Sequence, residues 1–329
     1  MTKITNFLNN CFDFEILLDK KEISYYLAKS AKCNSYIETL GKHSDSLHKW
    51  IDRSYEEDFQ QSFLAEIKHA IRKLRISIAN LAIDVTPEPF YGKTRNLHII
   101  NCEKSKKHSA EFHFVNCHII DRNQEIPIMS FPVRYGNAIS QTIKLISVCK
   151  SIFFRIRSIR FDRGFYAANL IHFLENHNIK YLIFVPKKGG VLKEHLNKTE
   201  KFDILKHNLC LKSNKRKFFV VTEILACKDV CNHDWLFATN IKFKSAEECV
   251  FFYKRRWQIE TNFRVADEAK IKSKSCKYMI RYFYHLCSAL FRLFWILFKR
   301  HEYYVPFKKY LDQEEQKLFF KIYRIDPIF

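Results

Sequence analysis

Two acidic residues stand in apolar surroundings where a carboxylate needs a cation. Asp84 lies inside the apolar run Leu81-Ala-Ile-Asp-Val85, and Asp162 directly follows the apolar stretch 155–161. An ionised carboxylate in such a strand is costly unless a cation or a hydrogen-bond donor meets it. Two acids at the ends of neighbouring strands could share a divalent metal ion, whereas a strand-end Asp such as Asp162 could equally cap the following turn.

A third acid, Glu260, ends the segment Tyr253-Lys-Arg-Arg-Trp-Gln-Ile-Glu260. At 100° per residue on a helix, Tyr253, Arg256 and Glu260 fall within about 60° of arc. Ser245 with Glu248 forms a capping-box pattern, which predicts that this helix begins at Ser245 and runs to about Lys270. The helix should bury one side and present the three residues along its edge, although a simple Arg256–Glu260 ion pair would have the same spacing.

The elements around these acids predict an α/β fold. Strands are expected at 81–85, 111–120, 126–133, 155–161 and 181–186, and helices at 138–150 and 166–176. The order β-β-β-α-β-α-β fits a mixed sheet flanked by helices and is that of a ribonuclease H-like core. Residues 187–244 interrupt it with strand-like segments at 218–226 and 234–241, which predicts a β-rich insertion.

The first 76 residues are expected to form a helical DNA-binding domain. Helices are predicted at 22–32, 35–41, 46–53 and 60–74. Two short helices joined by a turn favour a helix-turn-helix, with Ser46, His48, Lys49 and Arg53 facing DNA. A plain helical bundle explains the pattern equally well. The predicted domains are therefore 1–76, a first core part at 77–186, the insertion at 187–244, and at 245–329 the Glu260 helix with C-terminal helices that complete the core.

The composition favours a nucleic-acid partner. The chain has 56 Lys and Arg against 35 Asp and Glu, a net charge of +21, and 47% hydrophobic residues. This surplus attracts polyanions, and the apolar content excludes global disorder. The 11 cysteines show no disulfide framework, which predicts a reduced compartment. Cys227, Cys231 and His233 offer three zinc ligands without a fourth, so structural zinc is not favoured there.

One apolar stretch, 278–298, has almost the length of a membrane span. It contains Arg281, His285 and Arg292. An Arg near a bilayer centre costs about 2.5–3.5 kcal/mol, so a buried core helix is the prediction.

Taken together, the segments resemble the insertion-sequence transposases with a DDE catalytic triad, in the branch called insertion sequence family four. Tyr253-x2-Arg256-x3-Glu260 is similar to the family's Y-x2-R-x3-E signature. Further similar segments are Leu81-Ala-Ile-Asp84 with Thr86 and Tyr91-Gly-Lys93, Phe161-Asp-Arg-Gly164, and Trp235-Leu-Phe-Ala-Thr-Asn240. The resemblance covers roughly residues 78–299 and includes the insertion before the Glu.

The resemblance implies a mechanism. Asp84, Asp162 and Glu260 would be catalytic and would hold two Mg²⁺ ions, which Mn²⁺ could replace, for two in-line phosphoryl transfers. The first would nick an element end, and the freed 3′-OH would then attack the other strand or the target.

The resemblance also implies contacts and partners. Tyr253 and Arg256 would contact the backbone near the cut, and Trp235 would stack a flipped base unless it is a core aromatic. The partners would be double-stranded DNA of element ends and target, with a homodimer in the synaptic complex and no membrane. The protein would be cytoplasmic and nucleoid-associated in a prokaryote.

One position departs from the family. The signature continues with a Lys seven residues after the Glu, where this chain has Asp267. Arg264 or Lys270 could supply the missing phosphate contact. The departure also leaves open a transposase-derived DNA-binding protein that no longer cuts, and another ribonuclease H-like nuclease is a further alternative.

Overall fold

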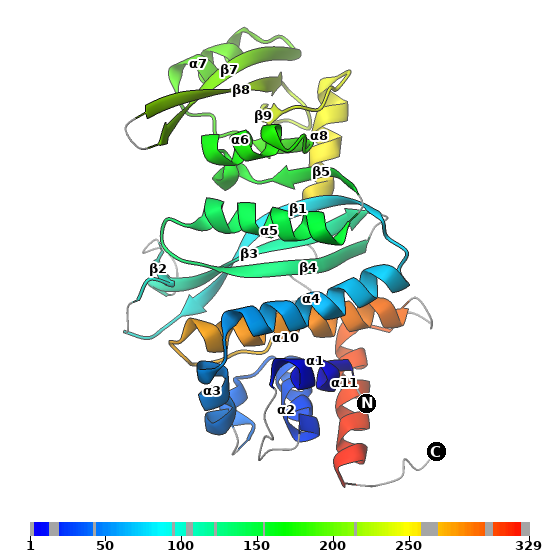
Figure 1. Cartoon of the computed structure of the whole chain (residues 1–329). Coiled ribbons are helices and arrows are strands. Elements are labelled where there is room, and N and C mark those ends of the chain that lie inside the picture. The colour runs from blue at the N-terminus through cyan, green and yellow to red at the C-terminus, as the bar shows by residue number, and fades with distance from the viewer. Residues whose placement is uncertain are drawn as a thin grey trace.

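The computed structural model describes residues 3–12, 20–41, 44–93, 96–102, 108–121, 124–153, 155–213, 216–257, 269–299 and 305–323. A twisted sheet occupies the middle and upper part of Figure 1, and most of the N-terminal helices lie below it with the two C-terminal ones. The expected residues Glu260, Arg264 and Asp267 lie outside the described residues.

The centre of the sheet has the predicted ribonuclease H-like order. Three long strands, β1 (Ile78–Phe90), β3 (Ala110–Asp121) and β4 (Gln124–Val133), pair antiparallel, and β5 (Arg155–Phe161) and β6 (Tyr181–Phe184) follow in parallel with β1. The short β2 (Ile99–Asn101) pairs with the start of β3. Helix α5 (Ala138–Ile152) connects β4 to β5. A 3₁₀ turn, η2 (Arg163–Phe165), and helix α6 (Ala168–Asn176) then connect β5 to β6. The predicted α/β class is confirmed.

The predicted β-rich insertion extends the same sheet. After α7 (Gly190–Lys198), β7 (Phe202–Ser213) and β8 (Arg216–Cys227) form a long hairpin, and β9 (Trp235–Thr239) pairs antiparallel with both β8 and β6. The sheet therefore has nine strands in the order β2-β3-β1-β5-β6-β9-β8-β7, with β4 also on β3. The sequence did not predict β7 or α7.

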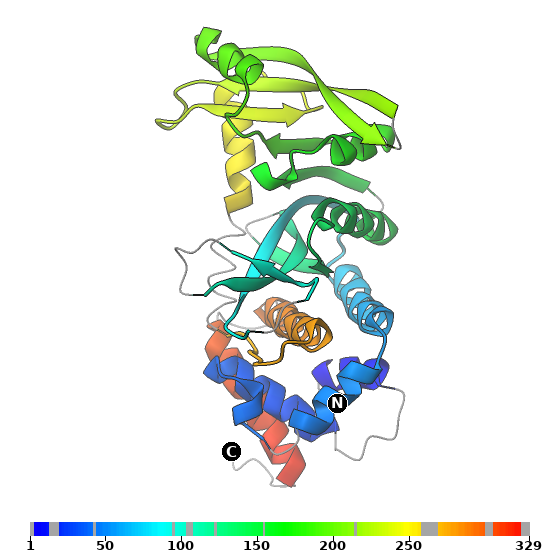
Figure 2. The same cartoon turned by 90° about the vertical axis from the view of Figure 1, so that its left-hand side faces the viewer.

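The apolar stretch at 278–298 forms the buried helix α10 (Tyr278–Lys299), as predicted. It lies beside α4 (Glu56–Lys73) under β4, and Figure 2 shows these two helices below the sheet. In α4, three acids in the first turn and Arg72 and Lys73 in the last complement the helix dipole. No helix in the described ranges is both long and apolar enough to cross a membrane.

The N-terminal helices pack around α10. They are α1 (Lys3–Cys11), α2 (Lys20–Cys33) and α3 (Ser44–Arg53), and α11 (Phe307–Tyr323) lies against α2. The helix expected at 35–41 is only a 3₁₀ turn, η1 (Ile37–Thr39). His48 points inward, with its ring 5.8 Å from that of Tyr284, so the expectation that it faces DNA is wrong because α3 buries that side. Lys49 and Arg53 are exposed.

Candidate active site

Asp84 and Asp162 lie on adjacent parallel strands at matching positions. Ile83 of β1 pairs with Phe161 of β5, and Asp162 continues in an extended conformation, so the two acids are the next pair. Neighbouring strands lie about 4.8 Å apart, which brings the two carboxylates to one place on the sheet. Both side chains are half-buried. The two acids predicted to share a metal ion therefore follow paired residues on adjacent strands.

The helix that carries Tyr253 is shorter than expected. Helix α8 (Ala246–Lys254) begins at Ser245, whose hydroxyl accepts a hydrogen bond from the Glu248 N–H, as the capping pattern predicts. It then tightens into the 3₁₀ turn η3 (Arg255–Trp257), and Ala269 and Lys270 are not helical. The single regular helix predicted to run to about Lys270 is therefore interrupted at Arg255, and the part of that prediction at 258–268 lies outside the described residues. Side chains three apart eclipse in a 3₁₀ turn, which lays Arg256 over Tyr253.

Arg256 connects this turn to the acids. Its Nη1 lies 3.3 Å from Asp84 Oδ2, and its Nε donates to the Tyr253 hydroxyl at 3.2 Å. Burial opposes the charged guanidinium, but the Tyr253 hydroxyl and the carboxylates of Asp84 and Asp162 together raise the pKa of Arg256 above its ordinary value. The same two carboxylates, after burial, raise the pKa of Tyr253, although Arg256 opposes them. The guanidinium of Arg256 is therefore a permanent positive charge next to the two acids of the site.

Two expected DNA contacts are buried. Tyr253 is 1% exposed and directs its hydroxyl at Arg256, which corrects the expectation that it reaches phosphate itself. Trp235 is 5% exposed, donates from Nε1 to the Val230 carbonyl and packs against Tyr253 and Phe237. Of its two interpretations, the core aromatic is the one seen. The exposed aromatic beside it is Trp257, whose ring centroid lies 6.2 Å away.

Lys270 is also engaged inside the protein. Its Nζ lies 2.9 Å from Oε1 of Glu88, and its side chain is 16% exposed. Glu88 is buried on β1, four residues after Asp84, and also approaches His285 at 3.3 Å and Arg281 at 3.9 Å. Lys270, expected as one of two residues that could supply a phosphate contact, is thus paired with Glu88 in the structure, because a buried carboxylate requires a counter-charge.

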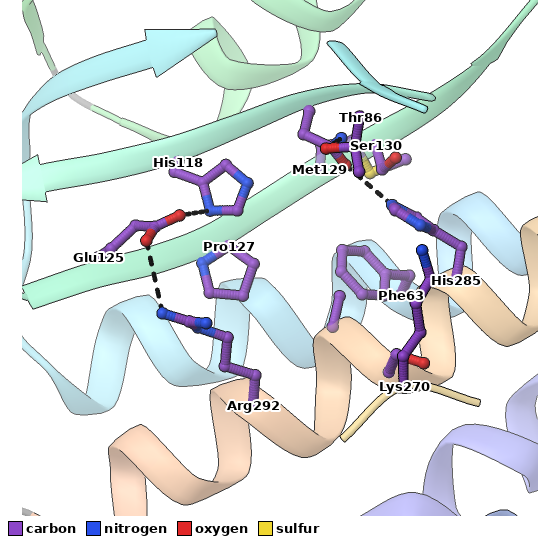
Figure 3. A pocket seen from close by; sticks show the side chains of 13 residues that line it. Phe63, Thr86, His118, Glu125, Pro127, Met129, Ser130, Lys270, His285 and Arg292 are labelled. Atoms are coloured by element: carbon purple, nitrogen blue, oxygen red, sulfur yellow. Dashed lines mark hydrogen bonds and ion pairs between the residues drawn. The ribbon is translucent and has the colours of Figure 1, made fainter. Parts of the chain in front are cut away.

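A cavity of about 60 Å³ lies between the sheet and α10, next to this pair. Figure 3 shows His285, Lys270 and Arg292 directed into it from one side and His118 and Glu125 from the other. His285 contacts Asn116 Oδ1 at 2.9 Å, and Asn116 is the partner of Asp84 across β1 and β3. The network thus fixes the strand that carries Asp84 relative to α10.

Arg160 is a buried cation near the acids that the sequence patterns did not predict. It stands two residues before Asp162 on β5, so it shares that residue's face of the sheet, and it is 1% exposed. Its guanidinium carbon lies 3.9 Å from the Phe252 ring centroid on α8, and Nε and Nη1 have no hydrogen-bond partner. Burial, followed by the charge of Arg255, lowers the pKa of Arg160 to about 9. The signal available in the sequence was its position two residues before Asp162 on the same predicted strand, which places both side chains on one face.

The zinc ligands considered at Cys227, Cys231 and His233 do not form a set. Cys227 is buried in the core, whereas Cys231 and His233 are exposed. None of the cysteines is in a disulfide.

The fold and sequence have known counterparts. The profile of the family described as "Transposase DDE domain" matches residues 80–291. A solved structure titled "Cryo-EM structure of piggyBac transposase synaptic complex with hairpin DNA" superposes with a TM-score of 0.60 at 13% identity, covering 99% of this chain and 79% of that one. No curated protein matches significantly. At this identity the structural likeness concerns the fold, and it agrees with a ribonuclease H-like transposase fold. Since the profile spans more than half of the chain, the protein belongs to the DDE transposase domain family.

Proposed function

We propose that the protein is a transposase that cleaves DNA at the ends of a mobile element and joins them to a target, with Asp84, Asp162 and Glu260 as its catalytic acids. The observation that carries the proposal is that Asp84 and Asp162 each directly follow the paired residues Ile83 and Phe161 of adjacent strands, with the guanidinium of Arg256 on Asp84. Membership of the family supports the chemistry. The assignment of Glu260 rests on its place in the signature that contains Tyr253 and Arg256.

The donor set fits divalent metal ions. The half-buried carboxylates of Asp84 and Asp162 offer oxygen ligands of the kind that suits Mg²⁺ or Mn²⁺, which would be held by these two residues together with Glu260. Such ions, when bound, would stabilise charge on the attacking and leaving oxygens of an in-line displacement.

The chain's own residues supply positioning. The β1 and β5 backbones fix the two Asp carboxylates, and the Glu88 network holds β1 against α10. The fork of Arg256, oriented by the Tyr253 hydroxyl, can turn from Asp84 to a phosphate and donate two hydrogen bonds. Arg256 would therefore hold the strand to be cut beside the acids.

Two observations support DNA as the partner: the net charge of the chain and the similarity to a solved transposase–DNA complex. The chain carries a net charge of +21, and the similar solved structure is titled as a synaptic complex with hairpin DNA. We infer that this protein also binds two element ends as a homodimer. The N-terminal residues 1–76, with exposed Lys49 and Arg53, would contribute to binding outside the cut site.

Cleavage of DNA fragments that flank the gene tests the proposal. The full chain should nick these fragments only with Mg²⁺ or Mn²⁺. Asp84→Asn, Asp162→Asn and Glu260→Gln should each lose cleavage while DNA binding persists, and Glu194→Gln, an exposed acid on α7, serves as the matched control. Undiminished cutting by the Glu260→Gln variant would sink the triad, and binding without any cutting by the parent chain would favour the inactive descendant.

A further inference from the structure

A second group of metal-ligand side chains lies at the far end of β3. Cys102 follows β2, His108 precedes β3, and Glu111 is on β3. Within the part of the chain that the structure describes, these form the one group of three such residues whose ligand atoms all lie within 4.8 Å of one another. His113, two residues after Glu111 on the same strand face, lies outside this group of three but contacts it, with Nε2 3.0 Å from Glu111 Oε2.

The carboxylate of Glu111 is the centre of this cluster. It is 4% exposed, and its two oxygens contact His108 Nε2 at 2.7 Å and His113 Nε2 at 3.0 Å. Protons shared between an imidazole and a carboxylate occupy the lone pairs that a metal ion would take. The thiol of Cys102 has no role in such a carboxylate–imidazole pair, yet it turns inward and donates to the His108 carbonyl at 3.2 Å. The convergence of a thiol on the pair distinguishes the cluster from a plain ion pair.

The donor chemistry selects the metal. One thiolate, two imidazoles and one carboxylate make four ligands of the types that Zn²⁺ takes in tetrahedral sites. Mg²⁺ prefers oxygen ligands and retains water, so it is a poor match for sulfur and imidazole. Binding would release the thiol proton, and each imidazole would carry its single remaining proton on Nδ1, so that the thiolate, both Nε2 atoms and the Glu111 carboxylate offer lone pairs to the ion.

This cluster is separate from the acids. Asp84 pairs with Asn116, whereas Glu111 pairs with Pro89, five positions further along β1. At about 3.3 Å per residue the two places are about 17 Å apart. Five positions is an odd number, so Glu111 also lies on the opposite face of the sheet from Asp84.

We propose that Cys102, His108, Glu111 and His113 form a structural site for a transition-metal ion of the Zn²⁺ type. The ion clamps the end of the β2–β3 pair. It also ties this end to Tyr91, whose ring lies 5.7 Å from that of His108, directly after the strand that carries Asp84. The site is a rigid clip on the edge of the core and takes no part in phosphoryl transfer.

Titration of the full, reduced chain with Co²⁺ alone tests the site. Cobalt bound to a thiolate gives a near-ultraviolet sulfur-to-metal charge-transfer band, which a site made only of carboxylates cannot give. The parent chain should show this band, saturating at one equivalent. Cys102→Ser should lose it, whereas Cys231→Ser, an exposed cysteine elsewhere, and Asp84→Asn should keep it.

Two further variants keep the test informative if the Cys102→Ser chain does not fold. His113→Gln and His108→Gln retain the thiol and should weaken Co²⁺ binding at least about tenfold. Zn²⁺ should displace Co²⁺ and raise the melting temperature of the parent chain but not that of Cys102→Ser. Absence of the charge-transfer band from the parent chain, or its survival in Cys102→Ser, overturns the proposal. Because these readouts do not involve DNA, they are independent of whether the protein is an active transposase.

Discussion

Arg256 Nη1 stands 3.3 Å from Asp84 Oδ2, so an acid of the candidate site is held by a buried arginine across 172 residues of chain. In the proposed function Arg256 would have two roles, neutralising Asp84 and receiving a phosphate. Only the guanidinium fork can do both from this position, because Lys has a single charged nitrogen.

Arg256→Lys should therefore reduce DNA cleavage by about 10²-fold, the usual cost of removing one positioned donor at a reacting group. Single-turnover cleavage at saturating DNA measures this. Arg255→Lys, the exposed neighbour on the same turn, is the matched control and should cleave normally. Equal rates for both variants would contradict a role for the fork.

Arg160 offers a test of an unpaired buried charge. Its Nε and Nη1 have no hydrogen-bond partner, and its guanidinium lies on the Phe252 ring. Arg160→Met retains the length and the contact with the ring but removes a charge whose burial is costly, so the free energy of unfolding should be unchanged or higher by about 1–3 kcal/mol. Urea denaturation measures the change. If the variant were destabilised by several kcal/mol, the charge would have an unrecognised partner.

Local sequence patterns predict part of this site. The rest depends on contacts between residues that are far apart in the chain. Asp84 and Asp162 could be predicted because each ends or interrupts an apolar strand, and parallel strands bring such positions together. The inward direction of Trp235 could not be predicted, because the sequence pattern of an aromatic residue in a strand is the same whether or not a helix covers it. The engagement of Lys270 depends on Glu88, which is 182 residues away and whose burial no local pattern reveals.

The ion pairs of Glu88 should make the fold sensitive to strong acid. Its pKa is lowered to about 2, because Lys270 and His285 outweigh the burial that would raise it. A carboxyl with a depressed folded-state pKa stabilises the protein above its unfolded pKa of 4.5, and this contribution is lost as the pH falls from 4.5 to 2. Glu88→Gln leaves Lys270 without its counter-ion and should cost about 3–5 kcal/mol at neutral pH.

Urea denaturation between pH 7 and pH 2 measures both effects of the Glu88 change. The variant should start less stable than the parent chain and lose less stability between pH 4.5 and 2. The exposed Glu194→Gln is the control and should retain parental stability at pH 7. Parallel pH profiles for Glu88→Gln and the parent would show that Glu88 is not the titrating group.

His98 should produce a second, milder acid transition. Its ring stacks on Tyr278 at 3.7 Å, and burial together with the charge of Arg134 lowers its pKa to about 4. The unfolded chain, with a His pKa near 6.5, binds a proton first as the pH falls, so stability should decline between pH 6.5 and 4. His98→Phe keeps an aromatic ring against Tyr278 but cannot titrate, and it should flatten this part of the profile. The melting temperature measured at intervals from pH 7 to pH 4 checks this, with the exposed His177→Phe as the control. If both variants keep the parental slope, another group controls stability in this range.

Replacing Trp235 by Ala should lower the stability of the protein far more than replacing Trp257 by Ala. Trp235→Ala removes a buried ring from the aromatic cluster under α8 and should cost about 3–5 kcal/mol of stability, with DNA cleavage falling as a consequence. Trp257 is 41% exposed beside it, so Trp257→Ala should leave the free energy of unfolding within about 1 kcal/mol of the parent. Chemical denaturation of the two variants separates the cases. A Trp235→Ala chain as stable as the parent would mean that the ring is not part of the core and would restore the prediction that it is available to stack on a base.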